Sequence, residues 1–267
     1  MLRKILLVDG SSLIYKCFYG LVKTDEDLED PRLKATFFRM LKDKLTKWRE
    51  RENYSYAMVA FDVDRKSFRN DIISDYKMQR KDMPEQLASW LPEIDNQLET
   101  IGLRTIYAPK NFEADDLIGT VSKRLGGCDF KVDIFTTDGD LLQLVDHLVS
   151  VYKVKNGFEL EKHDHHSFQS LNEGLLPCQI PLYKALSGDS ADNYPGVPGI
   201  GKINAVKLIQ TYKTVDRLIE SLEELKSGKI RESLLANKDL LFKCLKIAEI
   251  RTNIKINYSL SDFALKN

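Results

Sequence analysis

Acidic side chains follow almost every apolar run that could form a buried strand in this 267-residue chain. The runs cover residues 4–8, 57–61, 105–108 and 132–137. The acids that come at or soon after their ends are Asp9, Asp62, Glu113, Asp115, Asp116, Asp138 and Asp140. Because the carboxyl ends of parallel strands share one edge of a sheet, we expect these acids to converge in space.

Such a cluster of carboxylates suits divalent metal ions. Like charges raise each other's pKa, so the group needs a cation to stay ionised, and oxygen-only ligands favour Mg²⁺ or Mn²⁺. Asp189 and Asp192 extend the set. Each acid alone could be a turn or helix-start residue, and for residues 113–116 the helix start is the simpler interpretation. Their recurrence indicates two neighbouring metal ions, an arrangement suited to in-line hydrolysis at phosphorus.

A basic pair, Lys77 and Arg80, forms the second group of interest. A spacing of three residues would place both side chains on one face of a helix. From there they could reach a phosphate from the side opposite the metal ions. The alternative is a solvated basic surface, and the spacing alone does not decide between the two.

The glycine-rich segment 196–202 forms the third group. Glycines let a backbone approach a phosphate closely, and a following helix presents free amides there. The spacing is not that of a Walker phosphate-binding loop. The segment resembles the hairpin of helix-hairpin-helix elements, which hold the DNA backbone without reading its sequence. The alternative is a plain connection between helices.

Histidines and cysteines carry less information. His163, His165 and His166 are close in sequence, but we interpret them as part of a polar, solvated connection and not as a metal site. The four cysteines are widely spaced and form no metal-binding pair or disulfide pattern, which indicates a reducing compartment. The N-terminal apolar run is too short for a signal peptide, and no run approaches a membrane span, so we expect a cytoplasmic protein.

The net charge is zero, with 40 basic and 40 acidic side chains. If the acids gather in one cleft, the excess of lysine and arginine must cover other surfaces, so the local potential matters more than the total charge.

Alternating strands and helices predict an α/β fold with a mostly parallel central sheet flanked by helices over residues 1–175. The last strand of this region is expected at residues 150–154, with an irregular connection at 156–175. From residue 176 the pattern changes to short helices joined by glycine-rich turns, so we predict a second, helical region at 176–267. The principal helices are predicted at residues 11–22, 34–51, 84–101, 114–125 and 203–212.

Four segments make the chain similar to the 5′-nuclease family, which includes flap endonucleases, phage 5′-exonucleases and the 5′-nuclease domain of bacterial DNA polymerase I. The resemblance extends to about residue 256, with the motifs in the family's order. The segments are 8–12 (VDGSS), 112–116 (FEADD), 137–144 (TDGDLLQL) and 187–193 (SGDSADN).

The resemblance implies roles for particular residues. All nine acids named above match the family's metal ligands. Asp62, Glu113 and Asp115 would lie nearer one ion, Asp140, Asp189 and Asp192 nearer the other, and Asp138 between them. The basic pair would act on the reacting phosphate at the foot of a short helical arch, at about residues 77–101. The DNA contacts implied are Tyr15, Tyr76, Gly199, Gly201 and Lys202, with backbone carbonyls of a helix-three-turn-helix, at Val197 and Ile200, binding K⁺.

The implied function is structure-specific 5′-3′ exonuclease or flap endonuclease activity on nicked or branched DNA with a 5′ end, in replication or repair. We expect a free-standing, monomeric nuclease that uses Mg²⁺, with Mn²⁺ as a substitute, and K⁺ in the helix-three-turn-helix. One rival is a catalytically silent protein that binds branched DNA, which would be expected to lack some of the acids. Another is a PIN-type ribonuclease, which would be expected to lack the glycine-rich hairpin.

Overall fold

A six-stranded sheet forms the centre of the computed structural model, which describes residues 2–128, 130–223 and 228–265. Its strand order is β3-β2-β1-β4-β5-β6. All neighbouring strands are parallel except β5 and β6, which are antiparallel. The strands are β1 (Arg3–Asp9), β2 (Tyr56–Phe61), β3 (Thr105–Tyr107), β4 (Phe130–Thr136), β5 (Val149–Val154) and β6 (Leu160–His163).

The central strand β1 explains why the acids share one edge. Ile5, Leu6, Leu7 and Val8 are all fully buried, as expected for a strand covered on both faces. β1 pairs in parallel with β2 on one side and β4 on the other. Asp9 lies opposite Ala60 at the end of β2, so the residues that follow these three strands leave the sheet at the same edge.

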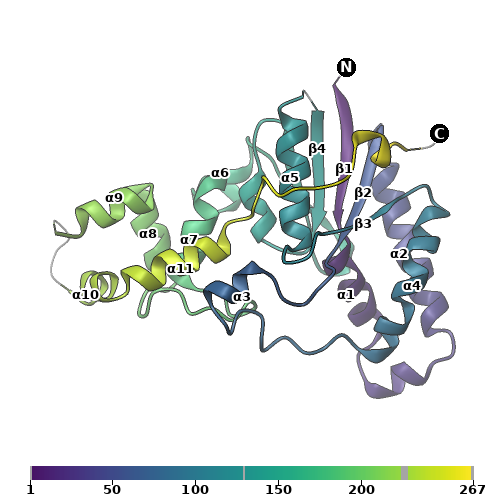
Figure 1. The fold of residues 1–267 in the computed structure, drawn as a ribbon, viewed down its shortest axis with the longest axis horizontal. Coiled ribbons are helices and arrows are strands. Elements are labelled where there is room, and N and C mark those ends of the chain that lie inside the picture. The colour runs from purple at the N-terminus through teal and green to yellow at the C-terminus, as the bar shows by residue number, and fades with distance from the viewer. Residues whose placement is uncertain (1, 129, 224–227, 266–267) are drawn as a thin grey trace.

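Helices cover both faces of the sheet (Figure 1). One hydrophobic cluster joins one face of the sheet to α1, α2 and α4, and the other cluster joins the opposite face to α5. The helices of this lobe are α1 (Gly10–Leu21), α2 (Leu33–Arg49), α3 (Phe68–Ile72), α4 (Glu85–Glu99), α5 (Ala114–Gly126) and α6 (Phe168–Leu171). Short 3₁₀ turns are η1 (Asp25–Glu29), η2 (Asp140–Leu144) and η3 (Asn156–Phe158).

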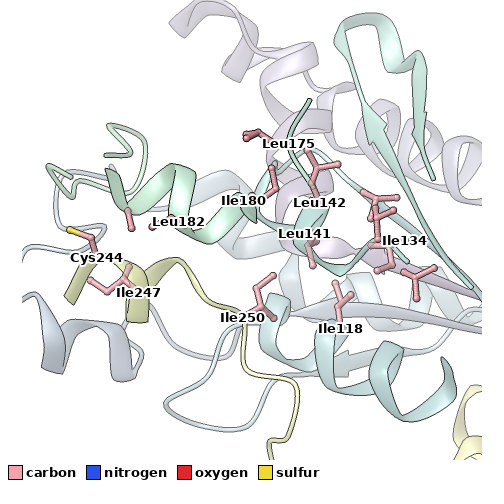
Figure 2. Packing of buried hydrophobic residues seen from close by; sticks show 14 of the residues in the cluster. Ile118, Ile134, Leu141, Leu142, Leu175, Ile180, Leu182, Cys244, Ile247 and Ile250 are labelled. Carbon is pink, nitrogen blue, oxygen red and sulfur yellow. The ribbon is translucent and has the colours of Figure 1, made fainter. Parts of the chain in front are cut away.

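A second, helical lobe extends away from the sheet (Figure 1). Its elements are η4 (Pro177–Gln179), α7 (Ile180–Ser187), α8 (Lys202–Tyr212), α9 (Val215–Glu220), η5 (Ser221–Glu223), α10 (Lys229–Ala236) and α11 (Lys238–Ala248). The two lobes share one hydrophobic core. Figure 2 shows this continuity, from Ile118 on α5 and Ile134 in the sheet to Cys244 and Ile247 on α11. The helical lobe is therefore packed directly against the sheet lobe and is not joined to it by a flexible linker alone.

The residues after α11 return to the first lobe and are called here the C-terminal strap (residues 249–265). The amide of Ile254 donates to the Thr120 side chain on α5 over 3.3 Å, and Arg124 donates to the Ile254 carbonyl over 3.0 Å. The strap ends in the turn η6 (Leu260–Phe263) and a bridge between Ala264 and Tyr56 at the start of β2. Part of the predicted second region therefore lies on the first.

The predicted elements agree with the structure except at the arch and in the connection at 156–175. The fourth helix spans Glu85–Glu99, and the residues from Lys77 to Pro84 are not helical, so only part of the expected arch is a helix. α4 also buries Leu87, Trp90 and Ile94 against the first lobe. The connection at 156–175 contains the unexpected strand β6.

His163 ends β6 and is buried, so its predicted place in a solvated connection is wrong. Its ring nitrogens lie 2.9 Å from Glu161 and 3.1 Å from Asn172. Among the residues described, no helix combines the length and the apolar character needed to cross a bilayer.

Candidate active site

Asp9 lies at the end of the central strand and caps the helix that follows. Its carboxylate accepts hydrogen bonds from the Ser12 amide at 3.0 Å and the Thr136 hydroxyl at 2.7 Å. Burial raises the pKa of Asp9 to about 6 in spite of these hydrogen bonds. Asp9 is therefore held rigidly between β1 and β4, in surroundings that disfavour its negative charge.

Asp115 and Asp138 complete this part of the site. Asp115 keeps some exposure, but the surrounding protein, and then the charges of Asp9 and Asp138, raise its pKa well above the usual range. The Asp138 amide donates to the Thr136 hydroxyl over 2.9 Å, which fixes the turn after β4. The three carboxylates thus come from three separate segments and repel one another, as the sequence predicts for a site that needs a cation.

Asp62 follows β2 and is exposed at the same edge. Its carboxylate accepts a hydrogen bond from the Ala114 amide over 2.7 Å, and its own amide donates to the Ser11 hydroxyl over 3.0 Å. These contacts join the end of β2 to the starts of α1 and α5. Asp62 therefore lies beside the other acids, with part of its carboxylate open to solvent.

Glu113 lies directly before α5 and accepts three hydrogen bonds. It accepts hydrogen bonds from Ser67 at 2.6 Å, Lys77 at 2.6 Å and Tyr76 at 3.3 Å. Burial alone would raise the pKa of Glu113, but the positive charges of Lys77 and Arg69 outweigh it and lower the pKa to about 2. Glu113 is therefore ionised and paired with a lysine that belongs to the predicted basic pair.

Asp116 does not have the position expected of a metal ligand. It is fully buried, and Arg69 donates to its two carboxylate oxygens over 2.8 and 2.9 Å. The amides of Glu113 and Arg251 donate to the same oxygens over 3.0 and 2.8 Å. With every favourable direction used, Asp116 has no free lone pair to offer an ion. We assign it a structural role and correct the prediction accordingly.

Lys77 and Arg80 lie near the acids, but not on a helix. Residues 74–80 form turns, and Lys77 has a left-handed backbone with φ of 57°. Its amide donates to the Asp192 carbonyl over 2.9 Å, while Arg80 forms an ion pair with the Asp192 carboxylate. The proximity of the pair comes from tertiary contacts with the loop before α8, and the helical spacing argument was incorrect.

Asp140, Asp189 and Asp192 form the other half of the acidic set. Lys184 on α7 forms an ion pair with Asp140 and donates to Asp189 over 2.8 Å. Burial alone would raise the pKa of Asp189, but the charge of Lys184 outweighs it and keeps the pKa below its usual value. In this half each carboxylate has a basic partner, because Arg80 pairs with Asp192.

The structure therefore brings eight of the nine predicted acids to one edge in two differently balanced groups. Among the described residues, no three acidic, histidine or cysteine side chains are already gathered tightly enough to hold one ion. The carboxylates stay apart for a different reason in each group. Those without a basic partner repel one another, and those with one turn toward the lysine or arginine. The two-metal arrangement thus remains a prediction.

The predicted nucleic-acid contacts divide into two kinds. Tyr15 is half-buried on α1, with its ring 6.4 Å from that of Tyr19 and nearly parallel to it, and its role in stacking on a base stays a prediction. Tyr76 is buried, and its hydroxyl contacts Glu113 and Asp192. The predicted DNA contact at Tyr76 is therefore replaced by support of the acids.

The glycine-rich hairpin lies at the start of α8, as predicted. Gly199 has a φ of 77°, which favours glycine, whereas Gly201 is extended and a side chain there would meet no atom within 4 Å. Lys202 is exposed at the first position of α8. Val197 and Ile200 are buried, and the Ile200 amide donates to the Val197 carbonyl over 3.0 Å.

Several contributors to the site escaped the sequence analysis. Arg69, Ser67 and Lys184 each contact one or more of the acids. Lys184 offered a signal, because it is the one charged residue in the otherwise apolar and uncharged helix IPLYKALS. Arg69 offered none, since it lies 47 residues from Asp116 in sequence.

A parallel sheet with an acid-lined carboxyl edge, joined to a helical lobe, defines an α/β protein suited to binding divalent cations. Residues 4–170 match the family model for the 5′-3′ exonuclease N-terminal, resolvase-like domain, and residues 175–267 match that for the 5′-3′ exonuclease C-terminal SAM fold. This chain belongs to the 5′-3′ exonuclease family. The family and fold predicted from the sequence are confirmed.

Among individual relatives, the chain is similar to a 5′-3′ exonuclease of Mycoplasma pneumoniae, with 32% identity covering 99% of this chain and 91% of the relative. It is 34% identical to DNA polymerase I of Lactococcus lactis over 98% of this chain, but spans only 30% of that polymerase.

A solved structure of the T5 5′-exonuclease with bound divalent zinc ions has the same fold, with a TM-score of 0.76 and 23% identity over 94% of this chain and 90% of the exonuclease. A T5 flap endonuclease solved in a complex with DNA and metal ions also matches, with a TM-score of 0.72 and 21% identity over 94% of this chain and 90% of that chain.

Proposed function

We propose that this chain is a divalent-metal-dependent 5′-3′ exonuclease and flap endonuclease that hydrolyses DNA phosphodiesters at 5′ ends and flap junctions. The observation that carries the proposal is the meeting of Asp9, Asp115 and Asp138, in which the charges of Asp9 and Asp138 raise the pKa of Asp115 and none of the three forms an ion pair within the described residues. Family membership and the T5 structure with DNA and metal ions support it. Replication or repair is the process in which such an activity would act.

The residues present fit a divalent metal. The donors are all carboxylate oxygens, which are the ligands that Mg²⁺ and Mn²⁺ prefer. Burial raises the pKa of Asp9 to about 6, so a cation bound there would stabilise the ionised form of its carboxyl group. When bound, such ions would activate the attacking water and stabilise the leaving oxygen. The residues that would hold them are Asp9, Asp62, Glu113, Asp115, Asp138, Asp140, Asp189 and Asp192.

Lys77 and Arg80 would orient the scissile phosphate. Both now pair with acids, Lys77 with Glu113 and Arg80 with Asp192. Metal ions that neutralise those acids would free the two basic groups for a phosphate. Tyr15 would stack on a base near the bend of the substrate, next to this pair.

Replacing Lys77 with methionine should slow the chemical step more than it weakens binding. A charge that acts on the reacting phosphate contributes mainly in the transition state. We expect a fall of about 100-fold in the single-turnover rate, with the dissociation constant for a flap substrate changed by less than about threefold. Rapid-quench cleavage and fluorescence anisotropy measure the two quantities.

The matched control is Lys81→Met, which removes an exposed lysine four residues away. It should leave the single-turnover rate unchanged. A Lys77→Met variant that binds tenfold more weakly but cleaves its bound substrate at the normal rate would show that Lys77 is a simple backbone contact.

The hairpin before α8 would hold duplex DNA. The first amides of α8, together with Lys202, can face a phosphate once glycine allows a close approach. Gly201→Val suits this test, because its extended backbone accepts a side chain and nothing in the protein obstructs it. We expect the dissociation constant for a flap with a long duplex to rise about tenfold or more, similarly for all sequences, as for a phosphate contact.

A short single strand is the comparison substrate, and its affinity should change little. An equal loss of affinity on both substrates would remove the hairpin from the duplex-binding surface. An unchanged melting temperature for Gly201→Val is the control for folding.

Finer features of the proposal follow the resemblance to the family. We propose Mg²⁺ as the working ion, K⁺ bound through the carbonyls of Val197 and Ile200, a monomer as the active form, and action in the cytoplasm. The tight turn at the hairpin, where the Val197 carbonyl accepts one hydrogen bond from the Ile200 amide, supports the K⁺ site.

One experiment tests the function directly. Flap, nicked and blunt duplexes labelled at the 5′ end are incubated with the protein and Mg²⁺, and the first product is mapped. Cleavage at the flap junction or of the 5′ nucleotide is the expected result. Tight binding of branched DNA without any cleavage would favour a catalytically silent binding protein, and cleavage restricted to RNA would favour a ribonuclease.

A further inference from the structure

Lys184 has an unusual position for a lysine. Its side chain is only 16% exposed, although it projects from a short helix, α7, whose other residues are uncharged. Its ammonium group pairs with Asp140, which follows β4, and donates to Asp189, in the loop after α7, over 2.8 Å. One lysine thus joins two carboxylates from different lobes.

The two halves of the acidic edge differ in this respect. Asp9, Asp115 and Asp138 form no ion pair within the described residues, whereas Asp140 and Asp189 share Lys184. A divalent ion that binds among Asp9, Asp115 and Asp138 meets carboxylates that form no ion pair within the described residues. An ion entering the second half meets carboxylates that already hold a positive charge.

We propose that Lys184 is a built-in counter-cation for Asp140 and Asp189, and that a divalent ion reaches these two carboxylates only by displacing its ammonium group. This inference rests on the metal site of the proposed function. It assigns Lys184 a positioning role, because the lysine keeps two mutually repelling acids close together until an ion arrives. It also predicts unequal affinities, with the half that contains Asp9 filled first.

The structure provides space for the displaced side chain. A pocket of about 960 Å³ adjoins the lysine and has Lys184, Asp189, Ser187 and Asn193 in its wall. A lysine side chain has a flexible four-carbon stem, so its ammonium group can move into this pocket and remain hydrated. The displacement therefore requires no unfolding of α7.

Metal binding in the absence of DNA tests the proposal without any measurement of cleavage. Mn²⁺ is titrated into the metal-free protein, and free Mn²⁺ is counted by electron paramagnetic resonance. The parent should bind one ion tightly and a second more weakly. Lys184→Met should tighten the second site by about tenfold or more, the scale of a direct neighbour of a metal ligand, and leave the first almost unchanged.

Two variants control for other effects. Lys184→Arg keeps the positive charge and should keep the second site weak. Lys4→Met removes another partly buried lysine, whose ammonium group lies 2.5 Å from the Glu52 carboxylate and takes no part in the acidic edge. This variant should leave both Mn²⁺ affinities unchanged. A weaker or unchanged second site in Lys184→Met would overturn the proposal, since Lys184 would then help the ion to bind or have no influence on it.

A measurement on the unmodified protein guards against a variant that fails to fold. An amine-reactive reagent followed by peptide mass spectrometry reports how accessible each lysine is. Labelling of Lys184 should increase several-fold when both sites are filled with Mn²⁺, while labelling of Lys4 stays constant. Unchanged labelling of Lys184 at two bound ions would overturn the displacement and leave the proposed function standing. A complete absence of Mn²⁺ binding would contradict both the displacement of Lys184 and the proposed metal-dependent function.

Discussion

Asp138→Asn should abolish cleavage while leaving the fold intact. Asp138 follows β4 and lies close enough to Asp115 to raise its pKa, so it occupies the centre of the candidate site. Loss of one ligand charge removes several kcal/mol of transition-state stabilisation, which corresponds to a fall in rate of about a thousandfold. Its carboxylate accepts one hydrogen bond, from the Asp140 amide over 2.9 Å, and an asparagine carbonyl can accept the same bond.

Single-turnover cleavage of a 5′-labelled flap at saturating Mg²⁺ measures this effect, with circular dichroism as the check on folding. Asp146→Asn is the matched control, because Asp146 is an exposed turn residue that precedes β5 and accepts only amide hydrogen bonds. It should cleave normally. Near-normal turnover by Asp138→Asn, or full activity of the parent in excess chelator, would contradict the metal-dependent mechanism.

Asp116→Asn should lower the free energy of unfolding by about 3–5 kcal/mol, the usual cost of removing one partner of a buried ion pair. Arg69 is only 3% exposed and would keep its charge without the carboxylate that accepts from both of its terminal nitrogens. Urea unfolding in chelator measures the loss. Because the measurement contains no metal, a residue whose sole role is metal binding would show little change.

The exposed pair of Asp30 and Arg32 provides the control, and Asp30→Asn should leave the unfolding free energy unchanged. Arg69→Met should lower the free energy of unfolding by as much as Asp116→Asn does. The double variant should lose much less than the sum of the two, since each single change takes the hydrogen-bonded partner away from a buried charge. Full stability of Asp116→Asn combined with weaker Mn²⁺ binding would restore Asp116 to the list of metal ligands.

The positions of the acids at the sheet edge could be predicted from sequence because they depend on local patterns. A fully apolar run such as Ile5 to Val8 predicts a buried strand. Parallel pairing then places Asp9 and the residues after β2 and β4 at one edge of the sheet. The hairpin could be predicted for the same reason, since glycine marks a position such as Gly199, where the left-handed backbone favours it.

The pairing of charges could not be predicted in this way. The contact between Arg69 and Asp116, and the one between Arg80 and Asp192, join residues that are 47 and 112 positions apart. The left-handed backbone of Lys77 likewise depends on the loop that its amide contacts. Such pairings follow from three-dimensional packing. The sequence therefore predicted which acids gather, but not which lysine or arginine pairs with each of them.

The C-terminal strap has a consequence for how the protein is made. Its amide at Arg251 completes the set of donors around Asp116, and its bridge at Ala264 closes against the first residue of β2. During synthesis the strands and α5 leave the ribosome before the strap, and the Arg251 amide follows Asp116 by 135 residues. The surroundings of Asp116 can therefore reach their final form only after the strap has been made. Such long-range closure is typical of slow folding, and a nascent chain that still lacks the strap has Asp116 without one of its donors.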